Sequence, residues 1–196
     1  MLSANSMGVT YSANCCSCRE RMAAREEDMA TIERLVWELE QRRLIEETLM
    51  AYSHFVDRND PASLVERVFC EDGHFELGSR HAVVGREDLR LMFAKTLAPF
   101  TRTSHHLSNV QIRFLGKDTA EADAYVYAWH LAADDGRRIE VWGRYADRLR
   151  LTDAGWRIES RRLTVAGTEG WIDPPFELAE RLPNPQHTPS PRVTRV

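Results

Sequence analysis

The sequence lacks the features of several large classes of protein. Its 196 residues contain no apolar run long enough to span a membrane, and its N-terminus has no apolar stretch of the secretory type. The formal net charge is −4, so the chain has no basic excess to hold nucleic acid or anionic lipid. We therefore expect a cytoplasmic protein that binds neither membranes nor nucleic acid.

Motifs for nucleotide, metal and serine chemistry are missing as well. The chain contains no G-x-G-x-x-G, P-loop, H-E-x-x-H or G-x-S-x-G sequence. Three of the four cysteines lie in "NCCSC", residues 14–18, and no second ligand pair follows at a spacing suited to zinc. We predict no metal and no cofactor, and we assign residues 1–28 to a disordered leader.

Helical periodicity begins where that leader ends. Apolar residues recur every three or four positions over residues 29–57, which predicts one long amphipathic helix or two in tandem. Asp60 and Pro61 are suited to cap and begin a second helix. The run from residue 86 to 99 has the spacing of a third helix and ends at a proline.

The second half of the chain alternates with a period of two. Four segments within residues 103–167 are separated by turns rich in Gly and Asp, which is typical of an antiparallel meander. Helices followed by such a sheet indicate an α+β domain, here residues 29–170, with helices packed on a curved sheet around an apolar pocket. Residues 171–196 are proline-rich and are expected to form a tail.

The stretch "TSHHLSN", residues 103–109, contains the best candidates for acid–base chemistry. Histidine is the commonest general acid–base because its pKa lies near neutral pH. In a strand, His105 and His106 face opposite sides, so only one of them can enter a given pocket. Strict alternation places Asn109 on the face of His105, and Val110 and Ile112 on the face of His106. The local sequence does not say which face is the inner one.

Two residues of the first predicted helix are further candidates. Tyr52 continues its apolar stripe, and Asp57 lies at its C-terminal end. A carboxylate there opposes the helix dipole at a cost of about 0.3–1 kcal/mol, so Asp57 invites a role outside the helix.

A later strand, "AYVYAWH", is rich in aromatic residues. Alternation puts His130 on one face and both Tyr127 and Trp129 on the other, and each face has the composition of core or pocket lining. We therefore predict that His130, Tyr127 and Trp129 contact a substrate.

The order of these motifs resembles the SnoaL-like group of the NTF2-like superfamily. The similar parts are a helix ending in "Y-x-x-x-x-D", then "FCEDGHFELG", "GREDLRLMF", "TSHHLSN" and "DRLRLTDAGWRIESRR". The resemblance covers roughly residues 30–170. It implies a cone-shaped barrel in which N-terminal helices pack on a curved, mixed or antiparallel sheet that encloses a pocket.

Within that superfamily the pattern is nearest to scytalone dehydratase, bile acid 7α-dehydratase and hexachlorocyclohexane dehydrochlorinase. These enzymes eliminate water or HCl without a cofactor. The family's "T-x-H" element falls on residues 103–105, so the resemblance implies His105 as the base. It also implies Asp57 as the partner of His105 and Tyr52 as a hydrogen-bond donor. We further predict that Asn109 contacts the substrate.

The chain departs from bile acid 7α-dehydratase at two places. The additional acid of that enzyme falls on Ala128, and its arginine in the last strand falls near Val165. A steroid substrate therefore does not carry over.

We predict a cofactor-independent lyase, most simply a dehydratase, for a small, largely apolar cyclic or aromatic substrate. Two alternatives stay open. The chain can be a non-catalytic small subunit of a ring-hydroxylating dioxygenase or a ligand-binding module, or it can be an isomerase, cyclase or carbon–carbon lyase with the same His–Asp dyad. Members of this group usually assemble through the outer sheet face, so a homo-trimer or homo-dimer is expected.

Overall fold

The computed structural model describes most of the chain, namely residues 16–77, 82–171 and 176–179. Helix α1 (Cys16–Asp57) begins well before the start that the periodicity indicates. Residues 16–28, predicted to be disordered, are therefore helical. The run from residue 21 to 28 consists of Arg, Met, Ala, Glu and Asp, most of which favour helices, so it needs no apolar stripe to continue the helix. The rest of the predicted leader and most of the predicted tail lie outside the described residues.

The chain divides into two compact units, Met1–Arg43 and Leu44–Val196. The first unit contributes the N-terminal part of α1, and the second contains the end of α1 and every strand of the described residues. Across the described residues, no helix combines the length and the apolar character needed to cross a membrane.

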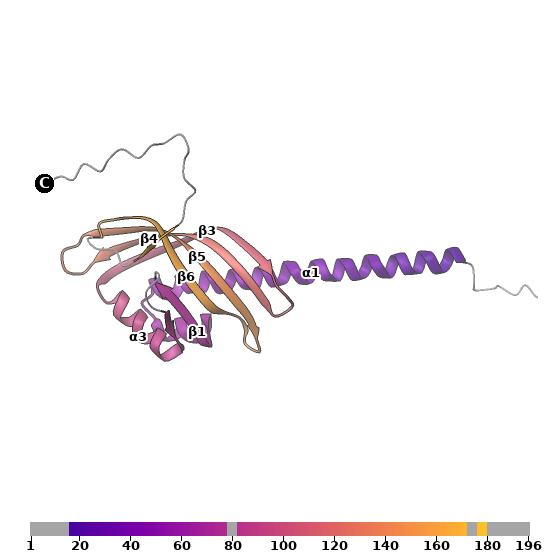
Figure 1. Cartoon of the computed structure of the whole chain (residues 1–196), viewed down its shortest axis with the longest axis horizontal. Coiled ribbons are helices and arrows are strands. Elements are labelled where there is room, and N and C mark those ends of the chain that lie inside the picture. Colours follow the sequence, from indigo (N-terminus) through magenta and orange to yellow (C-terminus); the bar gives the residue numbers. More distant parts are fainter. Residues whose placement is uncertain (1–15, 78–81, 172–175, 180–196) are drawn as a thin grey trace, which may run out of the picture. The chain divides into compact units, whose positions relative to one another are not determined.

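The second unit is a helix-covered, curved sheet (Figure 1). Its remaining described helices are α2 (Pro61–Val68) and α3 (Arg86–Leu97), and its strands are β1 (Phe69–Leu77), β2 (Ala82–Val84), β3 (Phe100–Phe114), β4 (Thr119–Ala132), β5 (Arg138–Thr152), β6 (Gly155–Glu169) and β7 (Glu177–Leu178). The strand order is β2-β1-β6-β5-β4-β3, and β7 also pairs with β6. Strand β6 is parallel to β1 and β7, whereas the other neighbours are antiparallel. The predicted α+β fold with a curved, mixed sheet is confirmed.

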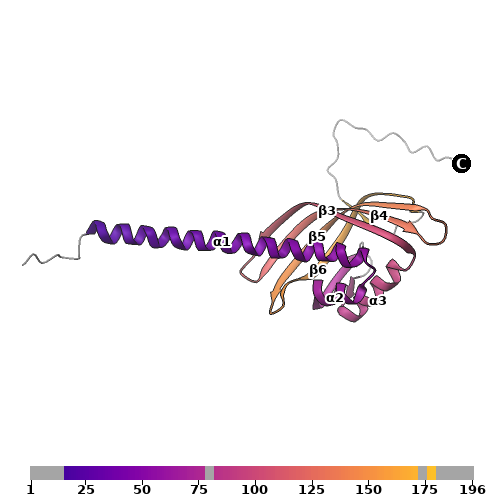
Figure 2. The same ribbon diagram turned by 180° about the vertical axis from the view of Figure 1, so that it is seen from behind.

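Burial along the end of α1 follows the helical period. Ile45, Leu49, Tyr52 and Val56 are separated by steps of four, three and four residues, so they form one stripe, and all are buried in the core of the second unit. The helix ends at Asp57, and Asp60 then caps α2 by accepting a hydrogen bond from the Ser63 N–H at 3.1 Å. The short helices α2 and α3 lie next to each other (Figure 2).

A β-bulge changes which residues of β3 face inward. The pairing of β3 with β4 shifts between Ser108 and Gln111, and Asn109 has a left-handed φ of 52°. Beyond the bulge, Val110 and Ile112 pack against the core. Strict alternation placed those two residues on the face of His106, and that prediction is wrong because one extra residue in the bulge reverses the inward and outward positions.

Candidate active site

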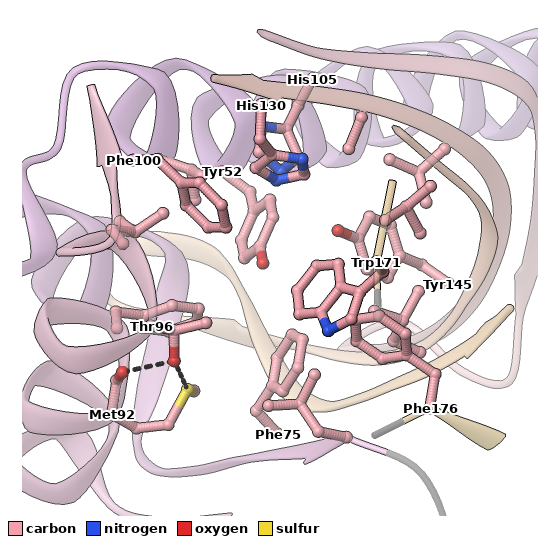
Figure 3. A pocket seen from close by; sticks show the side chains of 18 residues that line it. Tyr52, Phe75, Met92, Thr96, Phe100, His105, His130, Tyr145, Trp171 and Phe176 are labelled. Carbon is pink, nitrogen blue, oxygen red and sulfur yellow. Dashed lines mark hydrogen bonds between the residues drawn. The ribbon is translucent and has the colours of Figure 1, made fainter. Parts of the chain in front are cut away.

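The second unit encloses a cavity between its helices and the inner sheet face. The volume of this cavity is about 80 Å³, which is room for several waters or a small molecule. Its walls are mostly apolar, and their aromatic residues include Phe75, Phe93, Phe100, Trp171 and Phe176. Among the described residues that line it there is no Asp, Glu, Lys or Arg, so its polar groups are those of histidine, tyrosine, threonine and the indole of Trp171 (Figure 3). Such a wall favours a neutral, largely apolar ligand.

His105 and Asp57 form a hydrogen-bonded pair at the cavity wall. His105 Nδ1 lies 2.7 Å from Asp57 Oδ1, and the backbone N–H of His105 donates to Asp57 Oδ2 at 2.9 Å. Thr103 lies two residues earlier on the same strand face, and its hydroxyl also donates to Asp57 Oδ1, at 2.8 Å. The end of α1 and the start of β3 therefore hold one carboxylate with three hydrogen bonds.

These contacts keep Asp57 ionised. Partial burial raises the pKa of the carboxyl group, but the hydrogen bonds from the ring and backbone of His105 and from Thr103 outweigh it, so the pKa of Asp57 lies below its ordinary value. An ionised carboxylate only accepts hydrogen bonds, so Nδ1 of His105 must carry the proton. The lone pair of His105 is then on Nε2, at the opposite edge of a ring that lines the cavity.

His130 lies beside His105 on the neighbouring strand β4. The two rings are perpendicular, with centroids 5.3 Å apart, and both line the cavity. Burial, together with the positive charge that His105 can carry, lowers the pKa of His130 to about 4. His130 is therefore neutral near neutral pH. Its Nδ1 lies 3.3 Å from the carbonyl oxygen of Ile139, which only accepts, so Nε2 of His130 is also an acceptor.

Two tyrosines form another wall of the cavity, and a buried ion pair packs against their rings. Tyr52 and Tyr145 line the cavity, and the guanidinium carbon of Arg161 lies 4.1 Å and 4.0 Å from their ring centroids. Arg161 donates two hydrogen bonds to Asp147, at 2.8 Å and 2.7 Å, and both side chains are fully buried. Burial lowers the pKa of Arg161, but the charge of Asp147 outweighs it and holds that pKa above its ordinary value. Burial raises the pKa of both tyrosines, so each stays a neutral hydrogen-bond donor.

The sequence prediction missed this ion pair, although a signal for it was present. Asp147 falls on the apolar face of β5, between Tyr145 and Leu149, where strict alternation puts inward-facing residues. A charged residue at such a position requires a buried partner of opposite charge. The partner, Arg161, is on β6 and is set by strand pairing, which the sequence does not show.

Three of the predicted substrate contacts do not line the cavity. Tyr127 and Trp129 alternate with the buried Val126, Ala128 and His130, so they face the outer side of β4. The Tyr127 hydroxyl donates to Glu140 at 3.0 Å on that outer side.

Asn109 also lies away from the cavity. The bulge turns Asn109 outward, where it is exposed and lines a separate shallow depression with Tyr125 and Arg144. His106 is exposed on the outer face as well, and its Nε2 lies 3.0 Å from the Ser104 hydroxyl. Of the residues predicted from the sequence, the structure brings Tyr52, Asp57, His105 and His130 together.

The side chains that the structure describes also bear on whether this site could hold a metal ion. Within the described residues, no group of three or more His, Cys, Asp or Glu side chains is placed to hold a metal ion. The arrangement can instead take a proton at His105 Nε2 and offer phenolic hydrogen bonds to a developing negative charge.

Comparison with known proteins gives the family. Residues 37–162 match the SnoaL-like domain. The chain belongs to the SnoaL-like family. The resemblance seen in the sequence motifs is therefore confirmed, and the matched region contains Tyr52, Asp57, His105 and His130.

Several solved structures are similar to this chain. A candidate scytalone dehydratase from Novosphingobium aromaticivorans is 25% identical, with a TM-score of 0.72 over 76% of this chain and 99% of that one. A candidate aromatic ring hydroxylase from the same species is 30% identical, with a TM-score of 0.64 over 70% and 97%. A type 2 hexachlorocyclohexane dehydrochlorinase is 15% identical, with a TM-score of 0.64 over 74% and 97%, and shows the fold alone. A search of curated protein sequences gives no significant match.

Proposed function

We propose that this SnoaL-like protein is a cofactor-independent lyase that eliminates water from a small, neutral, cyclic or aromatic substrate. The observation that carries the proposal is the contact of 2.7 Å between His105 and Asp57 at the wall of an aromatic cavity. The similarity to a candidate scytalone dehydratase supports a dehydration. The scarcity of charged groups in the cavity wall supports a neutral substrate.

The proposed reaction begins with proton transfer to His105. Nε2 of His105 takes a proton from the carbon next to a ketone, and Asp57 stabilises the imidazolium that forms. The electrons of the broken C–H bond form a carbon–carbon double bond as the C–O bond at the next carbon breaks. The departing hydroxide takes the proton back from His105 and leaves as water, so atoms and charge balance.

The other polar groups have distinct roles in this proposal. Tyr52 donates a hydrogen bond to the ketone oxygen as this oxygen gains negative charge. Tyr145 is a second donor to the same oxygen. His130 is neutral and presents an acceptor, so it can hold the substrate hydroxyl that becomes the leaving group. Phe100 and Trp171 enclose the ring of the substrate.

The test is turnover of scytalone and of small cyclic β-hydroxyketones, followed by ultraviolet absorbance. Dehydration gives a conjugated ketone from the simple cyclic substrates and an aromatic naphthol from scytalone. We expect His105→Ala and Asp57→Asn each to lower kcat by about 10²–10⁴, the usual contribution of a placed acid–base group. His106→Ala is the matched control, because this histidine lies on the outer face, and it should keep turnover. Wild-type turnover by His105→Ala would remove the dyad from the mechanism.

A non-catalytic subunit of a ring-hydroxylating dioxygenase is the second candidate. The 30% identity to a candidate aromatic ring hydroxylase favours it. A structural subunit would have no need of His105 and would purify with a large iron-containing subunit. Copurification with such a subunit, combined with no turnover of any cyclic ketone, would favour this candidate.

An isomerase, a cyclase or a carbon–carbon lyase would share the first proton transfer. Exchange of the α-hydrogen of the same ketones in deuterium oxide, followed by NMR, detects that transfer without a leaving group. Exchange that depends on His105 but gives no dehydrated product would show that His105 is the base and that the reaction is not a dehydration. Identification of the product then distinguishes isomerisation, cyclisation and carbon–carbon cleavage.

A further inference from the structure

The first unit exposes an unusual amount of apolar surface along one helix. Six large apolar side chains in the described part of this unit are about half exposed or more, from 49% for Leu35 to 68% for Leu39. We call them the exposed stripe: Met22, Met29, Ile32, Leu35, Val36 and Leu39. Single exposed apolar residues are ordinary on a surface, whereas a run of them along one helix indicates a surface that binds another protein.

The spacing of the exposed stripe is that of a coiled coil. Met22, Met29 and Val36 are seven residues apart, and Ile32 and Leu39 form a second series of the same period, three residues after the first. These are the a and d positions of a heptad repeat, which pack against the equivalent positions of another helix. The stripe at the end of the same helix, from Ile45 to Val56, is instead buried by its own unit.

The charges on residues 21–43 favour another protein helix over a membrane or nucleic acid. This segment contains five arginines and six acidic residues, a net charge of −1. A membrane-surface helix or a nucleic-acid-binding helix requires a basic excess that this segment lacks.

The charges next to the exposed stripe favour a second copy of the same helix in parallel orientation. Glu26, Glu33 and Glu40 occupy the e positions on one side of the stripe. Two antiparallel copies would set this acidic row against itself, because e faces e there. In two parallel copies the acidic row faces the g positions of the other copy. Arg21 then lies opposite Glu26, which is favourable, and the neutral Leu35 lies opposite Glu40. Asp28 opposite Glu33 is a pair of like charges.

We propose that residues 22–39 mediate self-association of this chain as a short parallel coiled coil. The proposal does not depend on the proposed enzymatic activity. Because the a and d positions span fewer than three full heptads, this contact acts together with whatever other contacts the folded units make.

The first test uses the full chain with charges placed in the exposed stripe. The double variant Ile32→Glu, Leu39→Glu should raise the dissociation constant for self-association at least tenfold, measured by sedimentation velocity over a concentration series. The matched control is Ala23→Glu, Ala30→Glu, which adds the same charges on the far side of the same helix and should stay within about twofold of wild type. Equal behaviour of the two double variants would contradict the proposal, as would assembly that responds only to Trp142→Glu on the outer sheet face.

A second test reads the orientation directly and does not rely on the charged variant folding. In a background with Cys15, Cys16 and Cys18 changed to serine, Val36→Cys places one thiol at an a position. Parallel helices bring the two copies of residue 36 together, so mild oxidation should give a disulfide-linked dimer. Arg34→Cys, at an outward position, is the control and should give far less. Failure of Val36→Cys to cross-link, or equal cross-linking of both variants, would overturn the proposal.

Discussion

The inner and outer faces of strands β3 to β6 carry the same residue types in different surroundings. On the inner face, His105 is bonded to Asp57 and Arg161 to Asp147. On the outer face, His106 lies beside a serine hydroxyl, and Arg148 pairs with Glu159 at 2.9 Å with both side chains partly exposed. Water screens the outer contacts, whereas the fully buried pair of Arg161 and Asp147 acts in a low dielectric. The contact of His105 with Asp57 lies between these limits, because the His105 side chain is 8% exposed and that of Asp57 is 27% exposed. The same side chain is therefore a candidate for catalysis or stability on one face and of little consequence on the other.

The largest contrast is expected between the two arginine pairs. Arg161→Met should destabilise the fold by about 3–5 kcal/mol, because it leaves the Asp147 carboxylate buried without a partner. Arg148→Met should cost at most about 1 kcal/mol. Denaturant unfolding of both variants measures the difference, and similar losses would show that burial does not separate the two pairs. The double variant Arg161→Met, Asp147→Leu should regain most of the lost stability, since neither charge is then left unpaired.

Tyrosines on the two faces should differ in their effect on catalysis. Tyr52→Phe should lower kcat on cyclic β-hydroxyketones by about 10²–10³, the usual effect of losing one hydrogen bond to a developing oxyanion. Tyr127→Phe removes only an outer bond to Glu140 and should leave kcat unchanged. A loss of turnover in Tyr127→Phe equal to that in Tyr52→Phe would argue against the inner face as the site.

Histidines on the two faces should differ in how they link stability to pH. The pKa of His130 is about 4 in the folded chain and 6.5 ordinarily, so protonation favours the unfolded state. With His130 neutral in both states above pH 6.5, the free energy of unfolding is not reduced there. As the pH falls from 6.5 toward 4, protonation of His130 in the unfolded chain lowers the free energy of unfolding by about 3 kcal/mol. Unfolding free energies measured from pH 7 to 4 should therefore fall less steeply in His130→Gln. The control His106→Gln should keep the wild-type slope, and an unchanged slope in both variants would contradict the assignment.

The smallest effect concerns the bulge that decides which residues of β3 face inward. Asn109 has φ 52°, a region that costs a residue with a Cβ about 1–2 kcal/mol unless it is asparagine, aspartate or glycine. Asn109→Ala should destabilise by about 1 kcal/mol, and Asn109→Gly should be close to neutral. Turnover should stay at the wild-type level in Asn109→Gly, because Asn109 faces away from the cavity. A large drop in turnover would indicate that Asn109 contacts the substrate.

The periodicity of the sequence predicted the elements well where each element has one buried face. The stripe from Ile45 to Val56, the Asp60 cap and the long strands are all present as expected. The periodicity gave the wrong facing of residues after the bulge in β3. The extra residue of the bulge can be recognised only from the pairing of β3 with β4, which the sequence does not show. The periodicity also failed to tell apart two apolar stripes on α1, since Ile45 and Ile32 have the same local spacing and opposite burial.

The site divides in the same way. The sequence by itself determined the family, the order of the elements and the candidates Tyr52, Asp57 and His105, because these depend on residue type and on spacing along the chain. Only the tertiary structure decided that Asp57 reaches His105, that His130 joins them, that Tyr127 and Trp129 face outward, and that Arg161 meets Asp147. Each of these depends on which strand lies beside which, and on how water is excluded between them. Residues such as Asp57 and His105, 48 positions apart, are brought together where the last residue of α1 meets the start of β3.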